Sequence, residues 1–176
     1  MLVFWRQGYE ATSLRDLTSA LGVTPPSIYA AFGDKKQLFR DAVALYLGTP
    51  ERSVEIIAEA VTARDAAEQL LEASAVGFTG TQTPPGCLLA SATISCSPDA
   101  ADVQNELGAI RRRIEVTLAR KIRQDVRRGT LDADVDAGAT AAHVLAVIQG
   151  MSTLARDGAR RDKLRRVAAQ AMQSWP

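Results

Sequence analysis

The sequence predicts an all-α protein with a small N-terminal domain and a larger helical C-terminal domain. Alanine, leucine, arginine and glutamate, which are good helix formers, are abundant, and no stretch alternates β-branched and polar residues as a strand would. Glycine and proline, which interrupt helices, divide the chain into segments of helical length. The clearest segment is 99–128, where apolar residues recur every three or four positions and form one continuous stripe.

The positions of glycine and proline give the expected limits of the helices along the chain. The first four belong to residues 1–47, the predicted N-terminal domain, and the others to residues 48–176, the predicted C-terminal domain. The arginines of 99–128 lie off its apolar stripe, so we interpret them as a solvated helix face. The expected segments are 1–7, 14–21, 25–31, 35–47, 50–62, 65–79, 87–95, 99–128, 136–157 and 161–174.

Composition excludes several classes of protein. Of the 176 residues, 47% are hydrophobic and 23% are charged, as in an average globular domain. The net charge is +1, but it is divided unevenly: residues 51–108 carry −7 and residues 109–176 carry +7. One histidine and two cysteines make a metal site, a cofactor or a histidine-based catalytic triad improbable, so we do not expect an enzyme. No run approaches the roughly 18 apolar residues of a spanning helix, and we expect a cytoplasmic protein.

Residues 13–32 have the pattern of a helix-turn-helix. Ser13 is a candidate N-cap, Leu14, Leu17 and Leu21 form an apolar stripe, and Gly22 stands where a left-handed residue closes a helix. We expect Val23 and then Ile28 and Phe32 to face inward. The outward positions of the second helix are Thr24, Pro25, Ser27 and Tyr29, with Pro26 near the rim. The second helix would enter a major groove, where the side chains at its N-terminal end would contact base edges.

Lys35 opens the next helix in an unfavourable place. A cation in the first turn opposes the helix dipole, so a lysine there, beside a DNA-reading helix, suggests a phosphate partner. The free N–H groups of the same turn would add to the affinity for an anion.

Residues 4–46 resemble the DNA-binding domain of the TetR family of bacterial transcriptional regulators, without a gap. The matching residues are Gly8-Tyr9, Thr12-Ser13, Leu21-Gly22-Val23, Ile28-Tyr29, Phe32 and Lys35. The resemblance implies that Thr12, Ser13, Tyr29 and Lys35 contact phosphates, and that Thr24, Pro25 and Ser27, with Pro26 beside them, face bases. It also implies a homodimer that binds a palindromic double-stranded DNA operator, acts as a repressor and is released by a small-molecule effector.

Two features depart from the family pattern. The first helix is shorter than usual, with Met1 close to Phe4, and the reading helix offers no Arg, Asn or Gln for bidentate base contacts. Base recognition would then use hydroxyl groups, thymine methyls and DNA shape. The alternative interpretation is a helical partner-binding protein of the same fold that has lost DNA binding through its short N-terminus.

The resemblance places the effector inside the C-terminal domain, in a pocket with few ionisable groups that favours an apolar or aromatic molecule. Cys87 is either a small buried hydrophobe or a sensing thiol at a helix start, and His143 is either an interior or interface residue or a ligand contact. The candidate effector-binding residues are Phe78, Cys87, Leu88, Leu89, Ile94, Val103, Leu107, Ile110 and His143.

The last two expected helices carry a candidate dimerisation surface. Small residues four positions apart in 136–157 let another helix approach closely, and 161–174 adds a second amphipathic helix, so two protomers could form a four-helix bundle. The candidate residues are Gly138, Ala142, Leu145, Ala146, Gly150, Leu164, Val167 and Ala171.

Overall fold

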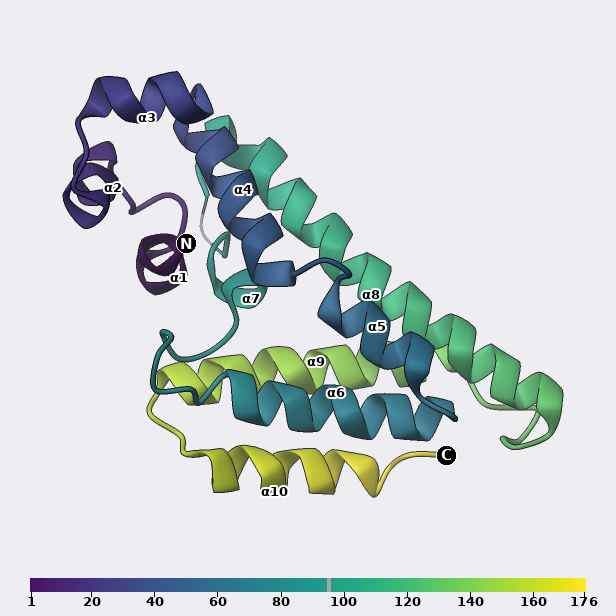
Figure 1. Ribbon diagram of the computed structural model, residues 1–176. Coiled ribbons are helices and arrows are strands. Elements are labelled where there is room, and N and C mark those ends of the chain that lie inside the picture. The colour runs from purple at the N-terminus through teal and green to yellow at the C-terminus, as the bar shows by residue number, and fades with distance from the viewer. Residues whose placement is uncertain (95) are drawn as a thin grey trace.

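The computed structural model describes every residue except Ser95, and the described residues form helices and connecting turns without a strand (Figure 1). The prediction of an all-α fold is therefore confirmed. The helices are α1 (Leu2–Gln7), α2 (Leu14–Leu21), α3 (Pro25–Phe32), α4 (Lys35–Leu47), α5 (Arg52–Glu59), α6 (Ala63–Gly77), α7 (Leu88–Ser91), α8 (Ala101–Arg128), α9 (Ala137–Arg156) and α10 (Arg161–Met172), and a short 3-10 helix, η1 (Pro98–Ala100), precedes α8.

Local capping explains where several helices begin and end. Ser13 and Asp16 form a capping box at the start of α2, in which the Ser13 hydroxyl accepts from the Asp16 N–H at 3.1 Å. Gly22 ends α2 in the left-handed conformation, with φ 67°, which favours glycine over any residue with a Cβ. Gly129 ends α8 in the same way.

The helices form two packed groups that meet along α8. In Figure 1, α6, α9 and α10 lie side by side, while α8 runs obliquely from the end of the molecule that carries α3 to the opposite end. One core cluster joins α5, α6, α9, α10 and the second half of α8. The other joins α1 to α4 with α7 and the first half of α8, and its centre is the pair of fully buried rings Phe4 and Phe39.

The structure changes the limits of several expected helices, most clearly in the middle of the chain. The segment 50–62 is helical over Arg52–Glu59, and 87–95 over Leu88–Ser91, with position 95 outside the described residues. The chain leaves α7 after one turn because Tyr9 N–H takes the carbonyl of Ala92, at 2.8 Å, in place of a further helical donor. The segment 99–128 starts with η1, because Pro98 lacks an N–H and suits the first turn of a helix.

Helix α9 is more apolar along its length than we expect from the sequence, since no run of about 18 apolar residues is expected in the chain. By length and composition alone, it is long and apolar enough to cross a membrane, and 33% of its most apolar stretch is buried. In this fold it packs against α6, α8 and α10. The apolar surface that remains outside these contacts is the feature of α9 that needs an explanation.

Ion pairs hold α4 along α8. Lys36 Nζ lies 2.8 Å from the Asp102 carboxylate, and the Arg40 guanidinium lies 2.7 Å from that of Glu106. These side chains are partly exposed, so each pair contributes little stability by itself. Asp102 and Glu106 lie in the first and second turns of α8, so the pairs link α4 to the N-terminal end of α8.

Removal of the Asp125 carboxylate should destabilise the protein. Asp125 is 3% exposed and accepts a 2.6 Å hydrogen bond from the Ala63 N–H, at the start of α6. Asp125→Ala leaves this buried N–H without its acceptor, so we expect the free energy of unfolding to fall by about 1–3 kcal/mol. Urea denaturation followed by circular dichroism measures the change. Asp132→Ala, at an exposed aspartate, is the matched control and should cost less than about 0.5 kcal/mol; equal losses would contradict the capping role.

Candidate nucleic-acid interface and internal cavity

Helices α2 and α3 form a helix-turn-helix with an exposed second helix. The turn is closed by Gly22, and the Val23 N–H donates to the Thr18 carbonyl at 3.2 Å. Ile28 is buried and anchors α3, while every residue from Thr24 to Ser27 is exposed. Figure 1 places α3 at the outer end of the molecule, away from α10, so its first turn is free to enter a groove.

The outward residues of α3 carry small polar and apolar groups. The hydroxyls of Thr24 and Ser27 lie 3.0 Å apart and share a hydrogen bond, and Pro25 and Pro26 expose their rings beside them. This first turn can present two hydroxyls and two apolar rings to base edges. Tyr29 follows one turn later and is 50% exposed.

Lys35, the first residue of α4, is held in place by contacts with the turn after α1. Its ammonium lies 4.5 Å from the centre of the Tyr9 ring and 3.4 Å from the Glu10 carbonyl. Partial burial lowers the pKa of Lys35. Lys35 takes part in no ion pair among the residues described, whereas Lys36 pairs with Asp102. The first-turn N–H of Gln37 is already used by Asp34, the N-cap, at 2.7 Å.

Three of the sequence expectations in this region need correction. The Thr12 side chain is fully buried and its hydroxyl donates to the Gly8 carbonyl at 2.6 Å, so it stabilises the turn after α1 and cannot reach a phosphate. Leu21 and Val23, which were expected to face inward, are exposed. Ser13 is exposed, but its hydroxyl is engaged in the capping box of α2.

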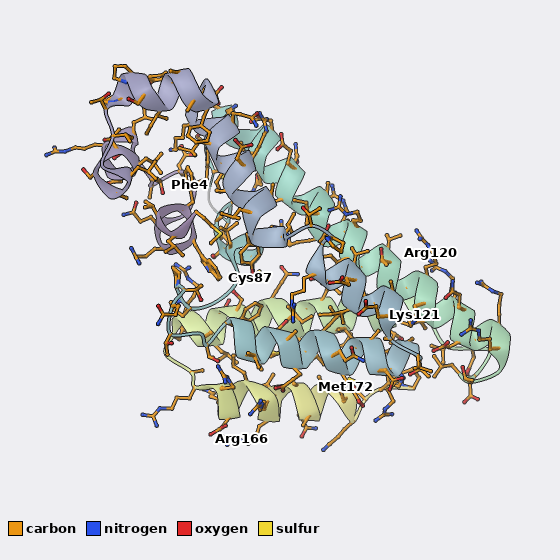
Figure 2. All side chains as sticks on the ribbon, in the orientation of Figure 1. Phe4, Cys87, Arg120, Lys121, Arg166 and Met172 are labelled. Carbon is orange, nitrogen blue, oxygen red and sulfur yellow. The ribbon has the colours of Figure 1, made fainter. Side chains whose placement is uncertain are left out.

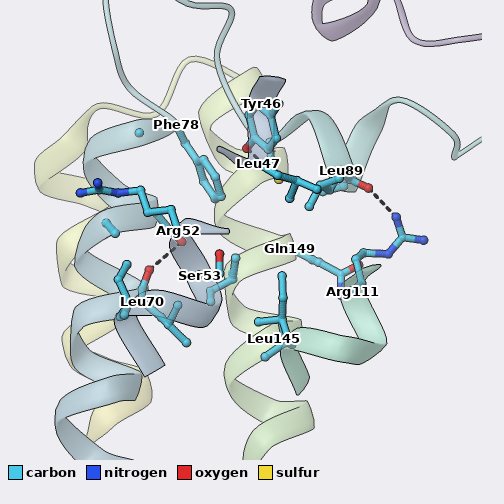
Figure 3. Close-up of a pocket in the computed structure, with 18 of the residues that line it drawn as sticks. Tyr46, Leu47, Arg52, Ser53, Leu70, Phe78, Leu89, Arg111, Leu145 and Gln149 are labelled. Carbon is cyan, nitrogen blue, oxygen red and sulfur yellow. Dashed lines mark hydrogen bonds between the residues drawn. The ribbon is translucent and has the colours of Figure 1, made fainter. Parts of the chain in front are cut away.

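A cavity of about 260 Å³ lies where the two groups of helices meet (Figure 3). Tyr46 of α4, Phe78 at the end of α6 and Leu145 of α9 approach it from three directions. Most of its wall is apolar, and the polar groups come from a few side chains. The lining residues are Trp5, Tyr46, Leu47, Arg52, Ser53, Ile56, Leu70, Ala73, Ser74, Gly77, Phe78, Cys87, Leu89, Ala90, Arg111, Ile114, Leu145, Ile148 and Gln149.

Only part of the expected effector pocket lines this cavity. Phe78, Cys87 and Leu89 do so. The structure places the other candidates elsewhere because the N-terminal helices use them as core or because they face outward. Leu88, Val103 and Leu107 are buried in the cluster around Phe4, Ile110 is half-buried between the two clusters, Ile94 is 70% exposed, and His143 lies on the outer surface of α9, 3.4 Å from the Ser174 hydroxyl.

The most informative residues that sequence reasoning missed come from the N-terminal helices. Trp5 of α1 and Tyr46 and Leu47 of α4 form part of the wall. Nothing in the local pattern distinguishes them from ordinary core residues, because their role depends on contacts with segments far along the chain. The N-terminal helices therefore meet the interior of the cavity directly.

Cys87 presents its thiol to this cavity, beside Tyr46. The Tyr46 hydroxyl donates to the Cys87 sulfur at 3.2 Å, and the Cys87 N–H donates to the Ser152 hydroxyl at 2.8 Å. Burial raises the pKa of the Cys87 thiol and also that of the Tyr46 hydroxyl. Both groups are therefore neutral near pH 7, which agrees with the interpretation of Cys87 as a small buried hydrophobe.

Arg111 lies at the edge of the cavity. Its guanidinium donates to the Leu89 carbonyl, and burial lowers its pKa (Figure 3). The other polar groups of the wall include Ser53 and Gln149. The cavity thus combines an apolar interior with a small polar rim, which is the usual composition of a small-molecule site.

The outer face of α9 and α10 exposes the small residues of the predicted dimerisation surface. Gly138, Ala142, Ala146 and Gly150 are exposed, and Val167 and Ala171 of α10 are half-buried beside a shallow groove. Leu145 and Leu164 are buried within the protomer, so their assignment to this surface is wrong. Both leucines are part of the core cluster that joins α9 and α10 to the rest of the C-terminal helices.

Comparison with known proteins gives two family matches and several relatives. The model of bacterial regulatory proteins of the tetR family matches residues 1–42, and that of the tetracyclin repressor-like C-terminal domain matches residues 66–172. The HTH-type transcriptional repressor ComR of Escherichia coli (strain K12) is 34% identical over 178 residues, covering 100% of this chain and 85% of ComR. BdcR, an HTH-type transcriptional repressor of the same organism, is 29% identical over 103 residues, which is 58% of this chain and 52% of BdcR.

Solved structures agree with these matches. A cysteine mutant of the TetR family transcriptional regulator CifR, complexed with 26-bp double-strand operator DNA, superposes with a TM-score of 0.93 at 36% identity, over 99% of this chain and 92% of CifR. A putative TetR regulator from Rhodococcus sp. RHA1 gives a TM-score of 0.68 at 35% identity, over 98% of this chain and 93% of the other. The chain belongs to the TetR family of bacterial regulatory proteins.

Proposed function

We propose that this TetR-family protein is a transcriptional repressor that binds a palindromic operator as a homodimer and leaves it when a small molecule fills the internal cavity. The observation that carries the proposal is the exposed first turn of α3 beside Lys35, in a fold that matches operator-bound CifR with a TM-score of 0.93. In this proposal residues 1–47 form the DNA-binding domain and residues 48–176 form the effector-binding and dimerisation domain.

The surface of α3 determines how the operator would be read. Thr24 and Ser27 each offer a hydroxyl that can donate to or accept from a base edge, and Pro25 and Pro26 offer apolar contact to thymine methyl groups. Hydroxyls discriminate bases less sharply than the bidentate contacts of Arg or Asn. The operator sequence is therefore recognised in part through the shape and deformability of the DNA.

Contacts with the phosphate backbone would supply much of the affinity. Lys35 is held against Tyr9 in one orientation, so it loses little conformational freedom when it meets a phosphate. Tyr29 is 50% exposed and is a second candidate for a phosphate contact. Ser13 remains a candidate for a phosphate contact because it is exposed at the start of α2.

The effector is a small, mainly apolar or aromatic molecule. The cavity volume, about 260 Å³, lies just below the range of about 300–1,000 Å³ that is typical of sites for drug-sized ligands. Trp5, Tyr46 and Phe78 give it aromatic walls, and the neutral thiol of Cys87 adds no charge. The ligand binds more tightly to an arrangement of the helices that differs from the DNA-bound one, and it therefore weakens operator binding. The operator weakens ligand binding by the same factor.

Selection of duplex DNA from a random pool tests the proposal. The full chain is incubated with the pool, bound duplexes are amplified, and the affinity of the enriched sequence is measured by fluorescence anisotropy at two salt concentrations. An inverted repeat whose affinity falls steeply with salt supports the proposal. If no sequence is enriched and the affinity for the pool is independent of salt, the proposal of DNA binding is rejected.

Lys35→Gln should weaken operator binding at every sequence. Loss of a phosphate contact in each protomer should raise the dissociation constant and reduce the slope of log affinity against log salt by about one for each protomer. Lys36→Gln is the matched control, because Lys36 is already paired with Asp102 and the Asp99 carbonyl. Anisotropy titrations over a range of salt concentrations measure both slopes, and equal slopes for the two variants would count against Lys35.

Ala146→Glu should dissociate the proposed dimer. Ala146 is exposed in the middle of the small-residue face of α9, where a carboxylate would be buried and unpaired if a second copy packed there. Sedimentation velocity at micromolar concentration should change from a dimer to a monomer. Ala58→Glu, at an exposed alanine of α5, should leave the sedimentation coefficient unchanged. A dimer that persists in the Ala146 variant would place the interface elsewhere.

A further inference from the structure

Trp5 connects the first helix to the internal cavity. It is 5% exposed, its indole N–H donates to the Gly86 carbonyl at 3.1 Å, and it lines the cavity together with Tyr46. The two rings meet edge to face, with centroids 4.8 Å apart. An aromatic side chain of the DNA-binding helices is thus part of the surface that an effector would touch.

Helix α1 and the turn that follows it hold one wall of the cavity at two points. The wall is the segment 86–92, which contributes Cys87, Leu89 and Ala90 to the lining. Trp5 binds the carbonyl of Gly86 at one end of this segment, and the Tyr9 N–H binds that of Ala92, 2.8 Å away, at the other end. Movement of the segment must therefore move α1, break these hydrogen bonds or both.

Arg156 adds a third attachment, from the C-terminal end of α9. Its guanidinium lies 3.3 Å from the Trp5 carbonyl and 3.4 Å from that of Arg6, so it supplies donors to the last turn of α1. The same side chain packs against Gly86, where an added Cβ would lie 2.9 Å from Arg156 Cγ. The end of α1 is therefore fixed to the effector domain from both sides.

A continuous aromatic cluster leads from α1 to the proposed DNA surface. Phe4, next to Trp5, packs edge to face on Phe39 of α4 with centroids 5.0 Å apart, and Tyr9 contacts the same ring at 5.0 Å. The ammonium group of Lys35 lies over the Tyr9 ring of this cluster. Close-packed rings shift together because the interior has no room for one to move alone.

We propose that Trp5 is the positioning residue through which the occupancy of the cavity is transmitted to the DNA-binding helices, by way of α1. The inference rests on the proposed function and adds the route by which it is regulated. The ion pairs between α4 and α8 are a less direct route, since none of Lys36, Arg40, Asp102 and Glu106 lines the cavity. A molecule in the cavity presses on Trp5 and on the wall that Trp5 holds, and α1 then shifts the Tyr9–Phe39 cluster under Lys35.

A double-mutant cycle tests this route without knowledge of the effector. Ser74→Phe fills the cavity from α6 with a side chain of the chain itself. We expect it to raise the dissociation constant of the selected operator about tenfold, within the usual range of coupling between sites. In a Trp5→Leu background the new phenyl ring has room in the cavity. There, Ser74→Phe should change the dissociation constant of the operator less than about threefold. Val76→Phe, on the exposed face of α6, is the control and should change neither background.

The cycle separates coupling from a merely structural role of Trp5. A structural role changes operator affinity by the same factor with and without Ser74→Phe, so the coupling between the two positions is zero. That result would overturn the proposal and leave the effector cavity in place. The proposal for Trp5 is also overturned if Ser74→Phe leaves operator affinity unchanged in both backgrounds. If the unaltered chain binds no selected duplex, the proposed function itself is rejected.

A second measurement keeps Trp5 intact, in case its variants fold poorly. The chain has two tryptophans, so Trp175→Phe leaves Trp5 as the one fluorophore of that type. Since coupling is reciprocal, binding of the selected operator should shift the emission of Trp5. A Trp5 emission spectrum that is the same in free and operator-bound protein would overturn the proposal.

Discussion

The N-terminal helices depend on α7 and α8 to complete their core. Their core cluster includes Leu88, Val103 and Leu107 from the rest of the chain, and these residues add to the small core that so short a stretch of chain can bury by itself. This shared core is the constraint on which the other features depend. The partly buried side chains of Cys87 and Ile110 pack against both clusters, so the two groups of helices are in contact at this boundary.

The cavity lies where this shared core ends. On one side the cluster around Phe4 is closed by α7, and on the other the bundle of α6, α9 and α10 closes around Leu71, Leu118 and Met151. Between them, residues of both clusters face a space that neither fills. A cavity at this boundary is well placed for control, because a ligand there adds contacts to helices of both groups at once.

The sequence predicts the DNA-binding surface more completely than the cavity. The limits of α2 and α3 follow from Ser13, Gly22 and Pro25, which are local signals, and helical periodicity then identifies which side of α3 faces outward. Thr12 was assigned by resemblance alone, and its burial depends on the fold of the turn after α1. The cavity wall joins positions as distant as Trp5 and Gln149, and no local pattern contains such a contact.

The uneven distribution of charge along the chain has an internal explanation. Acidic residues of 51–108 meet basic partners from elsewhere: Glu51 pairs with Arg113 and Glu72 with Arg165, while Asp102 and Glu106 pair with Lys36 and Arg40. Figure 2 shows Arg120 on the second half of α8, toward the end of the molecule opposite α3. The basic residues around Arg120 therefore lie away from α3. In the proposed function, part of the affinity for DNA comes from groups around α3, which include Lys35; within the part of the chain that the structure describes, Lys35 takes part in no ion pair.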